Sequence, residues 1–446
     1  MPVKSRLNER QQIGSRCCSD PCKQCCSNYE KNNCPTGYKG LVVSCFGKKW
    51  IGFGNCFLYN NIGVGCHTIM YLNSIGWLFN GIGLIEKCYC VVSFHFATLA
   101  VYRLMASPII ICPKIILFLC RCLLYYVDIF ELMIGTEIHF APIQGYTDNE
   151  YRNVHSAFFG GIDFYYTPYL SVENSGNIKL LTEIERVPDQ LKSLTIPQLL
   201  AANINETKTI ANHIAHEDFK MVNLNLGCPY PMVTRKGRGA ALIGKPLLVK
   251  QMVEMLIENF GFTVSLKMRS GLESEYEIFT FLDCFPHSIV KQIIVHPRVA
   301  LQLYKGKADV EIFGQCKEMY PETDFVYNGD IASVSDFNRI SIIFPDQKKW
   351  MIGRGLMLNP ALASEIKNGK ENSLHQQEAP FVAFARLLVN EIEQQSANKE
   401  HALNRVKVQL KMLFANIVLL KQMSKKIQKS RSCDEIKSLL NETRFI

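Results

Sequence analysis

Cysteine is scarce over most of this 446-residue chain. Of 18 cysteines, 14 lie in residues 1–132, and only Cys228, Cys284, Cys316 and Cys433 occur in the 314 residues that follow. This distribution excludes a disulfide scaffold for the larger part of the chain and is typical of the cytoplasm, which is therefore the expected location. Charged residues make up only 20% of the chain against 48% hydrophobic residues, which excludes wholesale disorder and a fibrous architecture.

The chain also lacks a clear membrane span. Residues 89–102 contain no Lys or Arg but number only 14, too few to cross a bilayer. Residues 109–127 are long enough but include Pro113, Lys114 and Arg121. Each central cation costs about 2.5–3.5 kcal/mol on insertion, so membrane contact is not expected. The first residues also lack the apolar core of a secretory signal.

Residues 1–132 show no sustained helical or strand period and form a cysteine-rich apolar segment of unknown role. The pair Cys22 and Cys25 is not followed by the second close pair that a structural zinc site needs, so no metal is predicted. A recognisable pattern begins directly after Met133. We therefore expect Met133 to be the natural start, with the preceding residues outside the functional enzyme. The mass of the protein made from the native gene tests this expectation.

Residues 133–360 are predicted to form an α/β domain of the (β/α)₈, or TIM, barrel type. Eight short apolar runs alternate with helical patterns such as residues 246–260, which matches this fold in count and size. No Gly-x-Gly-x-x-Gly turn follows the first run, which argues against an open doubly wound sheet. The predicted strands are residues 137–143, 164–170, 194–200, 220–227, 263–269, 292–298, 324–330 and 349–355.

Polar residues occur at or just beyond the C-terminal ends of these runs, where barrel enzymes place their active sites. One such residue is easily a buried polar group with a partner, but nine together indicate a site. The last two strands end in Gly-containing turns, where this fold usually holds a phosphate. The nine residues are Gln198, Asn225, Cys228, Lys267, His296, Arg298, Asn328, Asp330 and Arg354.

Three of these residues have chemistry of their own. Lys267 interrupts an apolar strand, so it either pairs with a carboxylate or faces an anionic or electron-rich cofactor ring. His296 is either a packed core histidine or a hydrogen-bond donor to the same ring. Cys228 is either a small buried hydrophobe or a reactive thiol at the mouth of strand four. Just downstream, Arg235, Lys236 and Arg238 could hold a phosphodiester or line an ordinary solvated loop.

Acidic residues are absent from residues 401–431, which hold eight Lys+Arg. This stretch lies in residues 361–446, predicted to form a helical, basic C-terminal domain with a net charge of +5 from 14 Lys+Arg and 9 Asp+Glu. A solvated face and a membrane surface contact are the alternatives to nucleic-acid binding. One apolar helical stripe contains Val406, Leu410, Leu413, Phe414, Ile417 and Leu420, and the lysine triplet Lys421, Lys425 and Lys429 recurs at four-residue steps.

An ordered set of motifs resembles the tRNA-dihydrouridine synthase family of the bacterial type. The matches occur in family order over residues 136–360, about half of the chain, whereas residues 361–446 fit the family's helical RNA-binding domain more loosely. Ile143 departs from the family, which often has Met there. The motifs are Ala141-Pro142-Ile143-Gln144-Gly145-Tyr146-Thr147-Asp148, Asn225-Leu226-Gly227-Cys228-Pro229, Gly237-Arg238-Gly239-Ala240-Ala241-Leu242, Lys267-Met268-Arg269, His296-Pro297-Arg298, Asn328-Gly329-Asp330 and Gly353-Arg354.

The resemblance implies a barrel that binds FMN and uses NADPH to reduce the C5–C6 double bond of selected uridines in tRNA. Cys228 would donate the proton to C5, and a thiol with an ordinary pKa near 8.5 is protonated at neutral pH. Asn225 would touch flavin or uracil. The lysine triplet with Arg235, Lys236 and Arg238 would contact tRNA. The flavin contacts implied are Pro142, Ile143 and Gln144 in the first turn, Gln198, Lys267 and His296 at the ring or ribityl chain, and Asn328, Gly329, Asp330, Gly353 and Arg354 at the ribityl and phosphate end.

Two alternatives stay open on the sequence alone. A small-molecule flavin barrel of the dihydroorotate dehydrogenase or old-yellow-enzyme type would need neither the basic tail nor the cationic loop, and would act on a free small molecule. A non-catalytic RNA-binding barrel would purify colourless, whereas a flavoprotein is yellow. We infer no stable protein partner.

Overall fold

A computed structural model describes residues 135–173 and 175–442. The expectations for residues 1–132 and for Met133 as the start lie outside the described residues and stay predictions.

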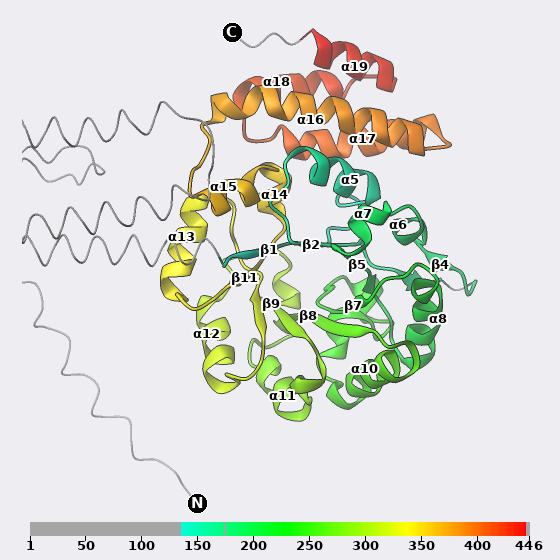
Figure 1. The fold of residues 1–446 in the computed structure, drawn as a ribbon, viewed down its shortest axis with the longest axis vertical. Coiled ribbons are helices and arrows are strands. Elements are labelled where there is room, and N and C mark those ends of the chain that lie inside the picture. The colour runs from blue at the N-terminus through cyan, green and yellow to red at the C-terminus, as the bar shows by residue number, and fades with distance from the viewer. Residues whose placement is uncertain (1–134, 174, 443–446) are drawn as a thin grey trace, which may run out of the picture. The chain divides into compact units, whose positions relative to one another are not determined.

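The described residues contain a closed parallel barrel (Figure 1). Its nine strands are hydrogen-bonded in the order β5-β2-β1-β11-β10-β9-β8-β7-β6. The two outermost strands, β5 (Thr195–Ile196) and β6 (Gln198–Leu199), are one chain segment interrupted by Pro197. Because proline has no N–H to donate, the segment is split there, and eight strand positions complete the barrel. The other strands are β1 (Glu137–Phe140), β2 (Phe164–Tyr166), β7 (Met221–Leu226), β8 (Thr263–Gly271), β9 (Gln292–Val299), β10 (Phe325–Tyr327) and β11 (Lys349–Ile352).

The sequence-based prediction of the barrel is confirmed, since each of the eight apolar runs contains one of these strand positions. Alternate side chains of the strands fill the interior, including the buried Tyr166, Ile294 and Met351. The opposite side chains pack against the surrounding helices in a larger core. These helices are α5 (Asn149–Phe158), α8 (Ile204–Ala215), α10 (Pro246–Phe260), α11 (Glu277–Cys284), α12 (Val310–Met319), α13 (Val334–Ile343) and α14 (Arg354–Leu358).

Short elements in the loops were not predicted. The antiparallel pair β3 (Ser171–Val172) and β4 (Ile178–Lys179) follows β2, and their turn contains Gly176 with φ +85°. That backbone conformation favours glycine. The remaining short helices are α6 (Thr182–Glu185), α7 (Asp189–Lys192), α9 (Pro231–Thr234), η1 (Gly239–Leu242), η2 (His287–Ile289) and η3 (Ala300–Gln302).

Five helices follow the barrel: α15 (Leu362–Asn368), α16 (Leu374–Gln395), α17 (Lys399–Leu413), α18 (Val418–Ile427) and α19 (Cys433–Asn441). The predicted apolar stripe is buried, but it belongs to two helices, because α17 ends at Leu413 and α18 begins at Val418. In Figure 1, α16 and α17 lie next to α5, and several hydrogen bonds join α17 to the residues at the start of α5. Within the described part of the chain, no helix combines the length and apolarity needed to cross a membrane.

Candidate active site

Asn225 at the end of β7 shapes the turn that carries Cys228. Its Oδ1 accepts hydrogen bonds from the backbone N–H groups of Gly227 at 3.0 Å and Cys228 at 2.9 Å. Its Nδ2 donates to Gln198 Oε1 at 2.8 Å. Gly239 packs against the same turn with φ +61°, and an added Cβ would lie 2.6 Å from the Cys228 carbonyl oxygen. The Asn-x-Gly-Cys spacing is therefore explained by a side chain that holds its own downstream backbone.

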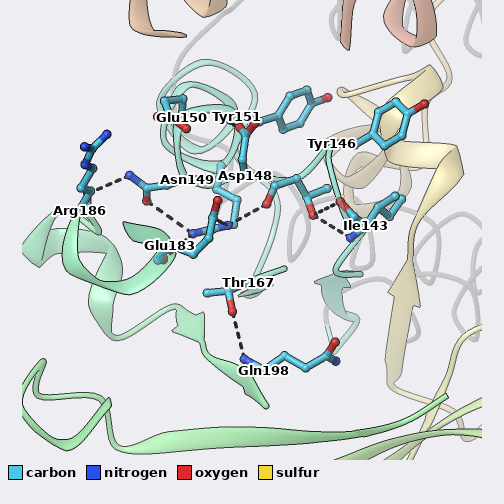
Figure 2. Close-up of polar contacts among 12 residues, drawn as sticks. Ile143, Tyr146, Asp148, Asn149, Glu150, Tyr151, Thr167, Glu183, Arg186 and Gln198 are labelled. Carbon is cyan, nitrogen blue, oxygen red and sulfur yellow. Dashed lines mark hydrogen bonds and ion pairs between the residues drawn. The ribbon is translucent and has the colours of Figure 1, made fainter. Parts of the chain in front are cut away.

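Gln198 links this turn to the neighbouring strands. Besides accepting from Asn225, its Nε2 donates to Asn223 Oδ1 at 2.7 Å, and Asn223 Nδ2 donates to Ser265 Oγ at 2.9 Å. Its backbone N–H donates to Thr167 Oγ1 at 3.0 Å, a contact drawn in Figure 2. These buried side chains form a hydrogen-bond network across β6, β7 and β8, and the network orders the turn that carries Cys228.

Cys228 is 8% exposed and lies among Leu200, Val233 and Tyr169. Burial raises its pKa above the ordinary value, so the thiol is protonated at neutral pH. Tyr169 hydrogen-bonds to it, and burial together with this thiol raises the pKa of Tyr169 to about 12. A protonated thiol beside a second weak acid suits proton donation better than nucleophilic attack, which needs the thiolate.

Lys267 lies on β8 at the point where β7 carries Asn225. Among the described residues no carboxylate lies within ion-pair distance of its Nζ, so the ion-pair alternative for this residue is wrong there. Burial, reinforced by the charge of Arg269, lowers the pKa of Lys267 to about 7. A buried cation without a protein partner is costly, and a bound anion would compensate it.

His296 on β9 has one nitrogen engaged and one orphaned. Nδ1 lies 2.5 Å from the carbonyl oxygen of Asn328, and because a carbonyl only accepts, Nδ1 carries the proton. Burial, with the charges of Lys267 and Arg269, lowers the pKa of His296 well below its usual value, so the ring is neutral. Its buried Nε2 has no hydrogen-bond partner in the described part of the chain. This neutral Nε2 is an acceptor, whereas the sequence led us to expect a donor.

The turns after β10 and β11 combine two close-packed glycines with an arginine pair. A Cβ on Gly329 would lie 2.0 Å from the Tyr327 hydroxyl oxygen, and one on Gly355 would lie 2.2 Å from the Ile331 carbonyl oxygen. Asn328 is held between these turns, since its Nδ2 donates to Met351 O at 2.7 Å. Gly353 lies beside the first turn, where a Cβ would be 3.4 Å from Ala141 Cβ.

Asp330, predicted to contact the flavin, already accepts hydrogen bonds from four protein donors. Its carboxylate accepts from Arg298 Nη1 at 3.0 Å and Nη2 at 2.5 Å, from Arg354 Nη2 at 3.0 Å and from the Ala308 N–H at 3.0 Å. These four donors occupy both oxygens, and a carboxylate repels a phosphate. We therefore interpret Asp330 as the residue that positions the two arginines, with Arg354 as the candidate phosphate ligand.

The turn after β1 contains the first predicted flavin residues. Gly145 adopts φ +81°, and the backbone folds back so that the Ile143 N–H donates to Thr147 Oγ1 at 2.8 Å. Pro142 and Ile143 are half-buried, and Gln144 is exposed. Figure 2 shows Ile143 and Tyr146 close together at this turn, with Asp148 at the start of the following helix.

Three residues near Cys228 escaped the sequence analysis. Arg269 Nε donates to Gly227 O at 3.1 Å, and its guanidinium lies 5.6 Å from the ring of Tyr304. Arg354 lies over the same ring at 4.8 Å. Tyr304 is thus contacted by two cations, and Tyr169 contacts the thiol. Arg269 was visible in its motif, but no local pattern marked either tyrosine.

The cationic loop separates into two kinds of residue. Arg235 and Lys236 are exposed, as expected for residues that meet an anion. Arg238 is buried, where Nε donates to Glu206 Oε2 at 2.9 Å and Nη2 to Val172 O at 2.9 Å. The Arg238 guanidinium is thus already paired with a carboxylate, and a contact of this residue with tRNA stays a prediction.

The lysine triplet is exposed, with Lys421 and Lys425 on α18 and Lys429 just beyond its C-terminal end. Arg405, counted with the same basic stretch, faces the barrel and pairs with Asp148 and Glu150. Arg405 is therefore not part of the exposed basic surface, whereas Lys411 on α17 and the lysine triplet are exposed.

Comparisons with known proteins identify the family of this chain. A family model described as "Dihydrouridine synthase (Dus)" matches residues 139–443. The tRNA-dihydrouridine(16) synthase of Neisseria meningitidis serogroup A is 24% identical over 317 residues, which cover 69% of this chain and 94% of that protein. The tRNA-dihydrouridine(16) synthase of Aquipseudomonas alcaligenes is 26% identical, with 68% and 98% covered. A tRNA-dihydrouridine(47) synthase-like protein of Arabidopsis thaliana is 30% identical over 148 residues, 33% of this chain and 21% of that protein.

The family match covers the barrel with its thiol turn, its glycine turns and the helices that follow. The chain belongs to the dihydrouridine synthase family, a family of oxidoreductases that modify tRNA.

Proposed function

We propose that this protein reduces the C5–C6 double bond of specific uridines in tRNA, using FMN and NADPH in the cytoplasm. One observation carries the proposal: a buried, protonated Cys228 thiol lies near Lys267 and His296, and among the described residues Lys267 has no carboxylate partner and His296 Nε2 has no hydrogen-bond partner. Family membership supports the reaction, and dihydrouridine synthases are flavin-dependent in general.

The residues at this end fit an FMN. Lys267 offers a cation to the electron-rich part of the ring system, and His296 Nε2 offers an acceptor to a ring or hydroxyl donor. Gly329 and Gly355 let the two turns pack tightly against Tyr327 and Ile331, and Arg354 beside them would supply the counter-charge for the phosphate. Pro142, Ile143 and Gln144 would then lie along the ring through their backbone.

When bound, reduced FMN supplies the hydride equivalent that C6 of the uracil receives. The protein supplies the proton: negative charge builds on C5, C4 and O4, and the S–H bond of Cys228 breaks as a C–H bond forms at C5. The thiolate left behind is stabilised by the Tyr169 hydroxyl and by the charges of Arg269 and Lys267, all of which lower the pKa of Cys228. Burial, which raises it, keeps the proton in place until that moment.

The exposed cations define where tRNA would bind. The lysine triplet lies on and just beyond α18, and Arg235 and Lys236 lie in the loop after the Cys228 turn. Phosphate contacts from both surfaces would orient the tRNA while one uridine enters the barrel mouth. Tyr304 is 48% exposed and lies beside Arg269 and Arg354, so a base that enters there would contact its ring.

Purified full-length protein tests the proposal. We expect a yellow protein whose flavin is bleached by NADPH, more slowly by NADH, and recovers its colour when unmodified tRNA is added. Dihydrouridine should then appear in the tRNA, and free uridine should leave the bleached flavin unchanged. A colourless protein that binds tRNA would favour the non-catalytic alternative, and equal reoxidation by free uridine would favour a small-molecule reductase.

A further inference from the structure

Two side chains of α17 contact the turn that follows β1. Arg405 Nη2 donates to Asp148 Oδ2 at 2.7 Å and to Glu150 Oε2 at 2.6 Å. Gln409, one helical turn further on, donates from Nε2 to Asp148 Oδ2 at 2.8 Å and to the Tyr146 carbonyl oxygen at 3.2 Å. We call these five residues the α17 contact. It joins the C-terminal helices directly to the barrel.

The α17 contact neutralises a concentrated negative charge. The side chains of Asp148 and Glu150 are 8% and 6% exposed, and the one guanidinium that pairs with both is 20% exposed. Asp148 also caps α5, since its Oδ1 accepts from the Tyr151 N–H at 3.0 Å. Without Arg405, two like charges would remain buried at the start of α5, and they would separate by moving the backbone that carries them.

The backbone so held is continuous with the residues proposed to face the flavin. The Tyr146 carbonyl oxygen accepts a hydrogen bond from Gln409, and Oγ1 of the next residue, Thr147, accepts one from the Ile143 N–H. From the barrel side, Arg152 donates to the Thr147 carbonyl at 2.7 Å and to Glu183 at 2.8 Å. Figure 2 shows Glu183, Asp148 and Ile143 around the same turn. The turn is thus fixed by the barrel on one side and by α17 on the other.

We propose that Arg405 and Gln409 are positioning residues for the flavin: from α17 they hold the turn after β1 in the shape that presents Ile143 and Gln144 to the cofactor. This inference rests on the proposed FMN site. It gives the C-terminal helices a second task besides tRNA binding, namely completion of the cofactor site.

The test compares Arg405→Met with two control variants in the full-length protein. Arg186→Met removes a different contact to the C-terminal helices, the Nη1 hydrogen bond to Gln395 O at 3.1 Å. Lys437→Met breaks the ion pair with Glu393 within those helices. Two readouts apply: hydrogen exchange of the segment 143–151 in FMN-free protein, and the FMN dissociation constant from quenching of flavin fluorescence.

We expect Arg405→Met to accelerate exchange in residues 143–151 while exchange in α12 is unchanged, and to weaken FMN binding about tenfold, the scale of one charge-assisted hydrogen bond. Both controls should match the unmodified protein in both readouts. Arg405→Lys keeps the charge and should recover much of the FMN affinity. If Arg405→Met is too unstable to study, Gln409→Met keeps both ion pairs and should show the same two changes to a smaller degree.

Unchanged exchange and unchanged FMN affinity in Arg405→Met, or equal losses in the two controls, would overturn the inference. Failure of the proposed function has a different signature, because the unmodified protein itself would then bind no FMN.

Discussion

Asp330→Asn should destabilise the protein because one carboxylate holds four donors. Asparagine has a single acceptor oxygen, and its NH₂ would face two of these donors, so at least two hydrogen bonds are lost. The Arg298 side chain is 2% exposed and would keep a buried charge without a counter-charge from Asp330. Breaking a buried pair in this way costs about 3–5 kcal/mol. Because Asp330 is itself 37% exposed and solvent screens it, we expect a loss of about 2–3 kcal/mol in the free energy of unfolding.

Urea unfolding of FMN-free protein measures this loss. Asp346→Asn is the matched control, since its ion pair with Lys317 lies at the surface with Asp346 77% exposed, and it should cost about 1 kcal/mol or less. Burial alone would raise the pKa of Asp330, but the hydrogen bond and the charge of Arg298 hold this pKa below its ordinary value. The stabilisation is therefore complete above about pH 4 and fades as pH falls further through the folded pKa. Equal losses in the two variants at neutral pH would refute this reasoning.

Three further predictions follow from the same geometry. Lys267→Met should raise the thermal stability of FMN-free protein at pH 6.5 but not near pH 10.5. Burial lowers the pKa of Lys267 to about 7, so below that pH the folded state bears an uncompensated charge that methionine removes. The variant should also bind FMN more weakly, and equal shifts of the melting temperature at both pH values would contradict the prediction. Changing the lysine triplet to Gln should flatten the slope of log K for tRNA against log salt by about two to three units without altering the flavin spectrum, and an identical slope would remove its function in binding. Gly329→Ala should lower FMN affinity and thermal stability, because its Cβ would lie 2.0 Å from a tyrosine hydroxyl oxygen, and an unchanged FMN titration would argue against a close-packed turn.

The sequence was sufficient for the barrel because the strand signal is local. Each strand is a short apolar run, and polar residues such as Asn225 near the end of β7 and Lys267 within β8 interrupt that run visibly. Cys228 and the glycine turns could be found in the same way, from spacing along a few residues. These features require no knowledge of what lies opposite them in the fold.

The functions of several residues depended on partners far away in the chain. Arg238 looks like a loop cation until Glu206, 32 residues earlier, neutralises it. Arg405 looks like part of a basic surface until it meets Asp148, 257 residues earlier. Tyr304 has no distinguishing neighbours in sequence and becomes notable only between two guanidinium groups. A one-dimensional pattern shows which groups are charged but not which charges are already compensated.

The most direct test of the central claim is single-turnover reduction of unmodified tRNA by NADPH-reduced protein, comparing the unmodified chain with Cys228→Ala. Loss of a general acid usually slows the chemical step about 10²–10⁴-fold. We expect a loss of that size in flavin reoxidation by tRNA, while FMN binding, tRNA binding and flavin reduction by NADPH are nearly unchanged. A Cys228→Ala variant that reduces tRNA within about threefold of the unmodified rate, far less than removal of a general acid predicts, would contradict the assignment of the proton donor and with it the account of this site.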